Sequence, residues 1–219
     1  MTNCRLTDPE FERGVKDFLA VCNVVKVFRH TRILQIAPRP FDFWSTMCNE
    51  GELLEKFNIQ LSPIPLPELT AQVKKAKEEG TEVKAVMDYC EEKMNVCVTE
   101  EQLENIAALK VAMRRLADQY GCNAVAIQCW NALQGELGIM PCAANSLLNE
   151  EGLPVVCETD IHGAITAVMA EAADLNRTPS FFADWTVRHP DNENGELLQH
   201  CGPLPPLRPA SSPPAAWSR

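Results

Sequence analysis

CNAVAIQCW, at residues 122–130, is the stretch that decides the fold, because it is apolar almost throughout. A strand without polar alternation is buried on both of its faces, and such strands are typical of parallel sheets that helices cover. Two further runs of this kind follow along the chain, LPVVCE at 153–158 and PSFFADW at 179–185. We therefore expect three buried strands in the second half of the chain.

Helical patterns separate these three runs, at roughly 136–149 and 162–175. An alternation of strand and helix is the signature of a parallel sheet with crossover helices. The sequence thus predicts an α/β fold, a layered parallel sheet with helices on both faces. Its adjacent parallel strands are expected at 123–129, 153–158 and 179–184, with ELLQH at 196–200 as a candidate fourth strand.

The first half of the chain is mainly helical in its pattern. RILQIA at 32–37 is a short expected strand that ends at a Pro-Arg-Pro turn, and the proline-rich 61–69 is either an edge strand or a rigid connector. Thr99 and Gln102 form a capping-box signal, and Gly121 is a helix stop, so a helix is expected between them. Other helices are expected at 9–30, 49–57, 67–79 and 81–95.

Composition excludes several classes of protein. The 219 residues carry a formal charge of −10 and a pI near 4.9, without a basic face, so we expect no nucleic-acid partner. No run approaches 18 apolar residues, so no membrane span is expected. Acidic residues interrupt the first twenty positions, where a signal peptide would be apolar. We therefore expect a cytoplasmic protein whose ten cysteines stay reduced, and most of them are expected to be small buried hydrophobes.

Polar residues follow the expected strands, at the edge where parallel sheets bind ligands. Asp160 could cap the helix that begins after it, or it could take part in chemistry. Glu136 lies in the apolar stretch LQGELGIM, where it is either a helix-start residue or the partner of a metal ion. His200 could be a histidine at a strand end that simply hydrogen-bonds to backbone, or it could bind a metal ion. Together, two carboxylates and an imidazole would suit a hard or borderline cation such as Mn²⁺.

Other chemistries lack their motifs. The sequence holds no G-x-G-x-x-G, no phosphate-binding G-x-x-x-x-G-K-[ST], no H-E-x-x-H and no G-x-S-x-G. The missing glycine loop argues against a nucleotide-binding domain.

The block from AVAIQCW through CETDIHGAITAVM, followed by PSFFADWT and LLQHCG, resembles the L-fucose isomerase and L-arabinose isomerase superfamily, closest to the fucose-isomerase-like proteins. Upstream, RILQIAPRPFDFWSTMCNEGELLEKFNIQL resembles the middle domain of the same family. The resemblance covers roughly residues 10–203. It implies a middle α/β domain at 1–160 and the first strands of an incomplete C-terminal domain at 161–203, followed by a tail at 204–219 whose prolines predict disorder.

The resemblance also implies a function, a metal-dependent aldose–ketose isomerase acting on a small sugar. Glu136 and Asp160 would be the catalytic pair, because their 24-residue separation resembles that of the family's metal-binding Glu and Asp. Mn²⁺ would be held by Glu136, Asp160 and His200, and Trp130 would offer an apolar face to the sugar or belong to the core. A homo-oligomer is possible. As a truncated member, the chain would have little or no activity alone. The alternative is a catalytically inactive module for binding or assembly.

Overall fold

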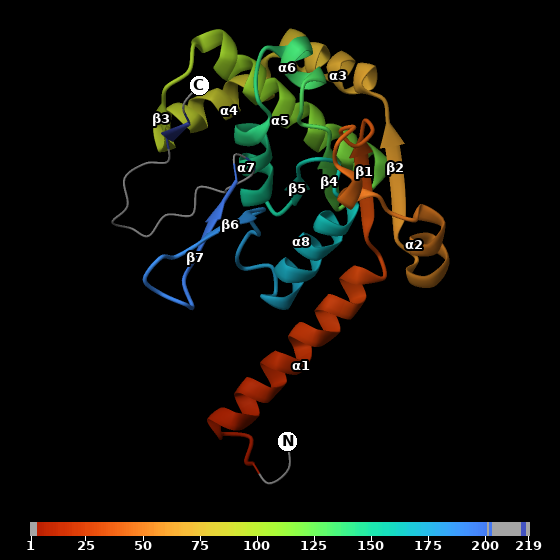
Figure 1. Cartoon of the computed structure of the whole chain (residues 1–219), viewed down its shortest axis with the longest axis vertical. Coiled ribbons are helices and arrows are strands. Elements are labelled where there is room, and N and C mark those ends of the chain that lie inside the picture. The colour runs from red at the N-terminus through yellow and green to blue at the C-terminus, as the bar shows by residue number, and fades with distance from the viewer. Residues whose placement is uncertain (1–3, 201, 203–215, 218–219) are drawn as a thin grey trace.

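The computed structural model describes residues 4–200, 202 and 216–217. Its centre is a four-stranded, fully parallel sheet in the order β2-β1-β4-β5. Helices lie on both faces of this sheet (Figure 1). The predicted α/β fold class is therefore confirmed, with a small antiparallel pair of strands added after the last helix. The strands of the sheet are β1 (Arg32–Ile36), β2 (Gln60–Ile64), β4 (Ala124–Ile127) and β5 (Val155–Val156).

Most expected helices are present. Their bounds are α1 (Pro9–Phe28), α2 (Glu50–Phe57), α3 (Leu66–Glu79), α4 (Thr81–Lys93), α5 (Glu100–Tyr120), α6 (Ala132–Leu137), α7 (Cys142–Glu150) and α8 (Ile161–Ala173), with a 3-10 turn η1 (Trp44–Thr46). The capping box of Thr99 and Gln102 begins α5, and Gly121 ends it in the left-handed conformation. The expected single helix at 136–149 is instead two helices, because Gly138 adopts a φ of 66° and ends α6.

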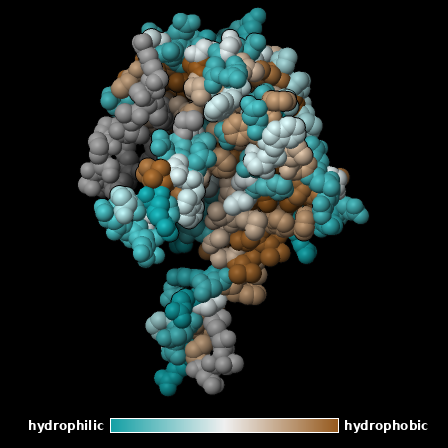
Figure 2. Space-filling model, viewed as in Figure 1, coloured by the Kyte–Doolittle hydropathy of each residue, from teal (hydrophilic) through white to brown (hydrophobic). Residues whose placement is uncertain are grey.

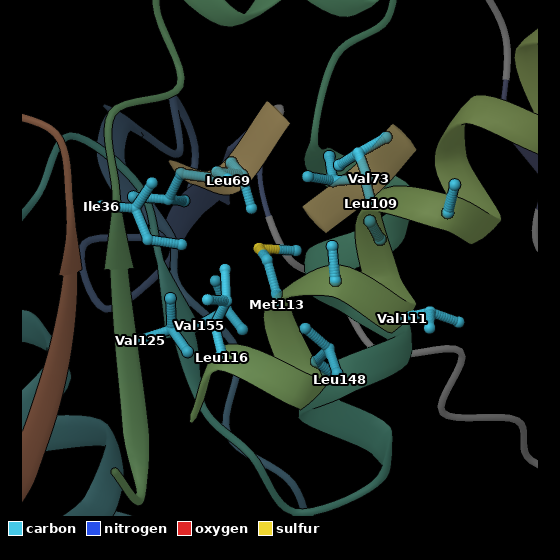
Figure 3. Packing of buried hydrophobic residues seen from close by; sticks show 14 of the residues in the cluster. Ile36, Leu69, Val73, Leu109, Val111, Met113, Leu116, Val125, Leu148 and Val155 are labelled. Atoms are coloured by element: carbon cyan, nitrogen blue, oxygen red, sulfur yellow. The ribbon is translucent and has the colours of Figure 1, made fainter. Parts of the chain in front are cut away.

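Alternate residues of the central strands face two separate cores. Leu34, Ile36, Val125 and Val155 pack toward α3, α5 and α7, and Figure 3 shows Met113 and Leu116 of α5 against Val125 and Val155. On the other face, strand residues such as Ile33, Ala124 and Val156 pack against α8 and α2. Every residue of β4 is buried, as its continuous apolar sequence predicted.

The prediction of a third parallel strand at 179–184 is wrong. Residues 179–183 form no strand, and Asp184 begins β6 (Asp184–Arg188), which pairs antiparallel with β7 (Glu196–Gln199). The candidate strand at 196–200 therefore exists, but it belongs to this hairpin. The sheet is completed at its other edge by β1 and β2, so 61–69 does begin with an edge strand. An apolar run alone did not indicate which partner it would pair with.

The molecule has two peripheral parts. Helix α1 projects from the body, has no buried residue, and packs on α8 near its own C-terminal end (Figure 1). On the face shown in Figure 2, apolar residues gather where α1 meets the body. In the tail predicted to be disordered, 204–219, most positions lie outside the described residues. Ala216 and Trp217 form β8, which pairs in parallel with β3 (Asn95–Val96).

Among the described residues, no helix has the length and apolarity that a membrane crossing requires. The cytoplasmic location, the division at residue 160 and a homo-oligomer remain predictions.

Candidate functional site

The loops that follow β1, β4 and β5 meet at the carboxyl edge of the parallel sheet. The backbone N–H of Thr159 donates to the carbonyl of Ile127 at 3.1 Å, and the Thr159 hydroxyl donates to the carbonyl of Pro38 at 3.4 Å. The N–H of Gln128 donates to the carbonyl of Ile36 at 3.0 Å. These bonds hold the three loops against one another where a parallel sheet usually binds its ligand.

Left-handed backbone conformations mark the same edge. Four residues that are not glycine have positive φ there, namely Ala37, Asn131, Glu158 and Thr159, with values of 63°, 65°, 55° and 53°. Each such conformation costs on the order of 1–3 kcal/mol, and it persists where the surrounding structure enforces it. The sequence therefore tolerates backbone strain at three loops of one edge, which is a common property of functional sites.

A buried group of ligand atoms lies at the centre of this edge. The Sγ atoms of Cys129 and Cys157 and a carboxylate oxygen of Glu158 all lie within 4.8 Å of one another. The Cys129 thiol donates to Glu158 Oε1 at 3.3 Å. Glu158 lies two residues after β5, behind Cys157, and is 6% exposed. A carboxylate this deep is costly unless other groups compensate it, so its surroundings decide its role.

Burial raises the pKa of Glu158, because the ionised form loses hydration. The thiol of Cys129 and the imidazole of His200 act in the opposite direction, while the carboxylates of Asp184 and Asp160 add to the increase. Glu158 therefore interacts electrostatically with two of the predicted residues, Asp160 and His200. A carboxyl whose pKa moves toward neutrality is well suited to accept and return a proton.

His200 is held by the hairpin. Its Nδ1 lies 2.8 Å from Asp184 Oδ2, and its ring packs edge-on against Phe182 with centroids 5.3 Å apart. Only 5% of the His200 side chain is exposed. Its Nε2 is buried and has no hydrogen-bond partner in the structure. The antiparallel pairing of Asp184 with Gln199, the neighbour of His200, is what brings the acid and the imidazole together.

Asp160 caps helix α8, as one interpretation of its position predicted. Its Oδ1 accepts the backbone N–H of Gly163 at 2.9 Å. The side chain of Asp160 also lies near Phe182, because both pack against Gly163. A Cβ built on Gly163 would lie 2.8 Å from Asp160 Oδ2 and 2.8 Å from the Phe182 ring. A hollow of about 350 Å³ opens beside it and is lined by Asp160, His162 and Phe182 among others. Capping does not use all of the carboxylate, so a second role for Asp160 stays a prediction.

Glu136 and Trp130 lie on the periphery of this group. Glu136 is exposed, in the last turn of α6 rather than at a helix start. Trp130, next to Cys129, is 47% exposed and packs edge-on against Phe43 at 5.7 Å. Within the described residues, the buried group of ligand atoms is formed by Cys129, Cys157 and Glu158, and Glu136 is not part of it.

Sequence reasoning missed Glu158 and Asp184 as site residues. Both follow apolar runs that were expected to be strands, in CETD and FFADW. The signal that could have found Glu158 is its position directly after the fully apolar run PVVC. The same signal does not reveal the partner of Asp184, because the hairpin brings His200 close to it.

The donor set of this edge fits a hard or borderline cation. Glu158, Asp160 and Asp184 supply carboxylate oxygens, and His200 offers a buried ring nitrogen that lacks a partner. Oxygen donors with one imidazole are the ligands that Mn²⁺ prefers in proteins. The residues present are therefore compatible with the predicted Mn²⁺, although Glu136 is exposed and does not belong to the buried group.

A larger cavity, of about 510 Å³, lies elsewhere, between α4, α5 and α7. The side chains around it are already paired, since Lys110 contacts Glu151 at 2.6 Å and Arg115 contacts Glu79 at 2.6 Å. It holds neither strained backbone nor a group of candidate ligand atoms among the described residues. The chemistry points instead to the carboxyl edge of the sheet.

No family model matches the chain. It is 29% identical over 183 residues to a protein named sulfoquinovose isomerase from Alkalicoccus urumqiensis, a match that covers 83% of this chain and 40% of that protein. Proteins of the same name from Priestia megaterium and Clostridium sp. strain MSTE9 are 24% and 27% identical over 182 and 212 residues. The chain thus spans about 40% of the length of the curated relatives it matches. Their names are those of sugar isomerases, the activity that the resemblance implied.

Proposed function

We propose that the chain carries the proton-transfer centre of a metal-dependent aldose–ketose sugar isomerase. The observation that carries the proposal is the convergence of Glu158, Asp184 and His200 at the carboxyl edge of the sheet. The relatives support the reaction class, and their name makes sulfoquinovose the first substrate to test. Cytoplasmic location and assembly into a homo-oligomer belong to the same proposal.

An aldose–ketose isomerisation moves a proton between C2 and C1 of the open-chain sugar. This requires one group that removes the proton and one that returns it. Glu158 suits the first role, because its burial raises the pKa and makes the carboxylate more basic. Asp184 suits the second role. The resemblance gave both roles to Glu136 and Asp160, and the geometry favours Glu158 over Glu136 because Glu136 is exposed.

The residues that would hold Mn²⁺ are Glu158 and Asp184, with Asp160 and His200 beside them. When bound, the cation would stabilise negative charge that develops on the sugar oxygens. The protein's own contribution is orientation. Asp184 accepts a hydrogen bond from the His200 ring, which fixes the position of that ring. Trp130 would present its exposed face to the apolar side of the sugar.

We expect turnover by this chain alone to be slow. It spans about 40% of the relatives' length, so these residues supply only part of the surface that encloses substrate in such proteins. A site that is open to water aligns its substrate poorly and loses much of its rate enhancement. Proton exchange at C2 is a more sensitive measure than net conversion, because it reports the first chemical step.

The test uses sulfoquinovose and Mn²⁺ in D₂O with the full chain, and proton NMR follows loss of the C2 signal. We expect Glu158→Gln to slow exchange by roughly 10²–10⁴-fold, the usual contribution of a general base. Glu136→Gln is the matched control, because it makes the same chemical change on an exposed side chain. It should retain the wild-type rate.

A loss confined to Glu136→Gln would overturn the assignment of Glu158 and restore the original prediction. Binding of the sugar without exchange in the wild type would favour the alternative, an inactive binding module. Calorimetric titration with the sugar distinguishes this outcome from a failure to bind.

A further inference from the structure

Two buried thiols face each other across the strand pair β4–β5. Cys129 follows β4 and Cys157 follows β5, and the register Ala126↔Val156 places the two strand ends side by side. They are 3% and 2% exposed. The isomerase chemistry described above uses neither thiol, although both lie within 4.8 Å of a Glu158 oxygen.

The spacing of these atoms matches a metal tetrahedron. For zinc, with Zn–S about 2.3 Å and Zn–O about 2.0 Å, a sulfur and an oxygen ligand are separated by about 3.5 Å. The distance between Cys129 Sγ and Glu158 Oε1 is 3.3 Å. Because all three ligand atoms already lie within 4.8 Å of one another, little rearrangement would bring them onto one cation.

His200 lies beside this group and is the candidate for a fourth ligand. Its Nδ1 contacts Asp184 Oδ2 at 2.8 Å, and a carboxylate on one ring nitrogen is the arrangement that orients a metal-binding histidine. The other nitrogen, Nε2, is buried without a partner. Gly202 lies against both the His200 ring and Cys157. A Cβ built on Gly202 would overlap the ring and lie 3.1 Å from Cys157 Sγ, so the ring is close to this thiol.

Asn145, which is not one of these four residues, also contacts the sulfur of Cys157. Asn145 Nδ2 lies 3.8 Å from Cys157 Sγ, a hydrogen bond of the kind that stabilises a thiolate ligand. The other amide atom of Asn145, Oδ1, is buried and has no partner in the structure. A buried polar atom without a partner calls for an explanation, and a cation bound beside these two atoms would be one.

We propose that Cys129, Cys157, Glu158 and His200 form a binding site for a thiophilic divalent cation of the Zn²⁺ class. Two sulfurs and one imidazole select such an ion over Mn²⁺ or Mg²⁺. Binding releases the two thiol protons to solvent. The site shares Glu158 and His200 with the proposed isomerase centre, so a Zn²⁺-class ion would compete there with the proposed Mn²⁺. The inference rests on the position of the thiols and does not depend on catalysis.

The test is a titration of the full, reduced chain with Co²⁺ under anaerobic conditions. Thiolate ligation gives a near-ultraviolet charge-transfer absorption, and tetrahedral geometry gives intense visible bands. Neither arises from carboxylate ligands in an octahedral site. We expect both signals in the wild type, and we expect Zn²⁺ to displace the ion.

Cys129→Ser and Cys157→Ser should each reduce the charge-transfer band and weaken Co²⁺ binding at least about tenfold, as loss of a ligand does. His200→Asn should keep the sulfur band and alter the visible bands. The matched controls are Cys90→Ser and Cys122→Ser, which change buried thiols in other parts of the fold and should leave the spectrum intact. Circular dichroism checks that each variant is folded, and X-ray absorption on the Zn²⁺-loaded wild type counts sulfur ligands without any mutation.

A wild-type spectrum without thiolate bands would overturn the proposal. So would bands that survive in both cysteine variants, or an absorption edge that shows only oxygen and nitrogen ligands. A Cys129–Cys157 disulfide that persists in the reduced preparation, seen as a mass lower by two hydrogen atoms, would equally contradict it.

Discussion

The parallel sheet and the β6–β7 hairpin hold opposite halves of the candidate site, and they are built differently. Every residue of β4 is buried, whereas every residue of β6 and β7 is exposed. Glu158 is positioned by the sheet, and His200 by the hairpin. The segment that leads into the hairpin is held through Ser180, which Asn149 and Glu171 contact, and through Phe182, which packs on His200. The site thus combines one rigidly packed acid with an imidazole whose position depends on a few polar contacts.

The largest expected difference between the two regions is in stability. Leu109→Ala should lower the free energy of unfolding by about 2–5 kcal/mol, because it opens a cavity beneath the sheet where Leu109 is fully buried (Figure 3). Leu197→Ala, on β7, removes a side chain that is 54% exposed. It should change the free energy of unfolding by less than about 0.5 kcal/mol. Urea unfolding followed by circular dichroism measures both. Equal losses would mean that the hairpin is part of the cooperative core.

A smaller effect is expected on the hairpin half of the site. Asp184→Asn keeps a hydrogen-bonding oxygen opposite His200 but removes the charge, and it should slow C2 proton exchange by roughly 10–100-fold, as loss of an orienting partner does. Nitrogen NMR of the His200 ring should show a changed tautomer balance, which a purely structural role would not cause. Asp191→Asn, an exposed change on the same hairpin, is the control and should be silent.

Next in size is the cap of α8. Asp160→Ala should lower the free energy of unfolding by about 1 kcal/mol, because the N–H of Gly163 loses its acceptor. Asp160→Asn should restore most of that stability, since an amide oxygen also caps. If the Asn variant is stable but exchanges C2 protons slowly, Asp160 has the catalytic role predicted for it as well.

The smallest expected effect on stability concerns the contact of Glu171, on α8, with Ser180, in the segment that leads into the hairpin. Burial raises the pKa of Glu171, whose Oε1 accepts the N–H of Ser180 at 2.9 Å and its hydroxyl at 2.8 Å. A raised pKa means that the folded state holds the proton more tightly than the unfolded state. This contribution to stability is therefore fully present below the unfolded pKa, near 4.3, and is lost as the pH rises through the folded pKa.

Glu171→Gln should remove this dependence of the free energy of unfolding on pH while keeping an acceptor for Ser180. Unfolding curves at several pH values above 4 measure the difference. Parallel pH profiles for the wild type and the variant would contradict the assignment.

Local sequence signals predicted the helices well. It was harder to predict which strand each apolar run would pair with. The capping box at Thr99 and the stop at Gly121 bound α5, because both act within one helical turn. PSFFADW was predicted as a strand because it is apolar, yet its Phe182 packs on His200 and beside α8 instead of entering the sheet. Which edge of the sheet accepts a strand depends on distant residues that no local pattern encodes.

The roles of the predicted site residues stay predictions, but their positions can be compared with the structure. The carboxyl edge, Asp160 and His200 were identified from strand ends, and the structure puts both residues near Glu158. Glu136 was chosen by its separation from Asp160 along the chain. Spacing along a sequence does not fix burial, however, and the chain turns Glu136 outward at the end of α6. The thiols next to Glu158 were read as core residues, which their burial alone does not distinguish from ligands.

The order of strands in the sheet also governs how this chain folds. Its central pair, β1 and β4, is joined at the first rung by Arg32 and Asn123, which are 91 positions apart. Closing so long a loop costs chain entropy before any strand pairing compensates for it, whereas α5 is delimited by contacts within single turns. We therefore expect helices α3 to α5 to form first and β1–β4 pairing to follow. In the part of the chain that the structure describes, β5 pairs only with β4, and Glu158 follows β5, so we expect the candidate site to assemble last.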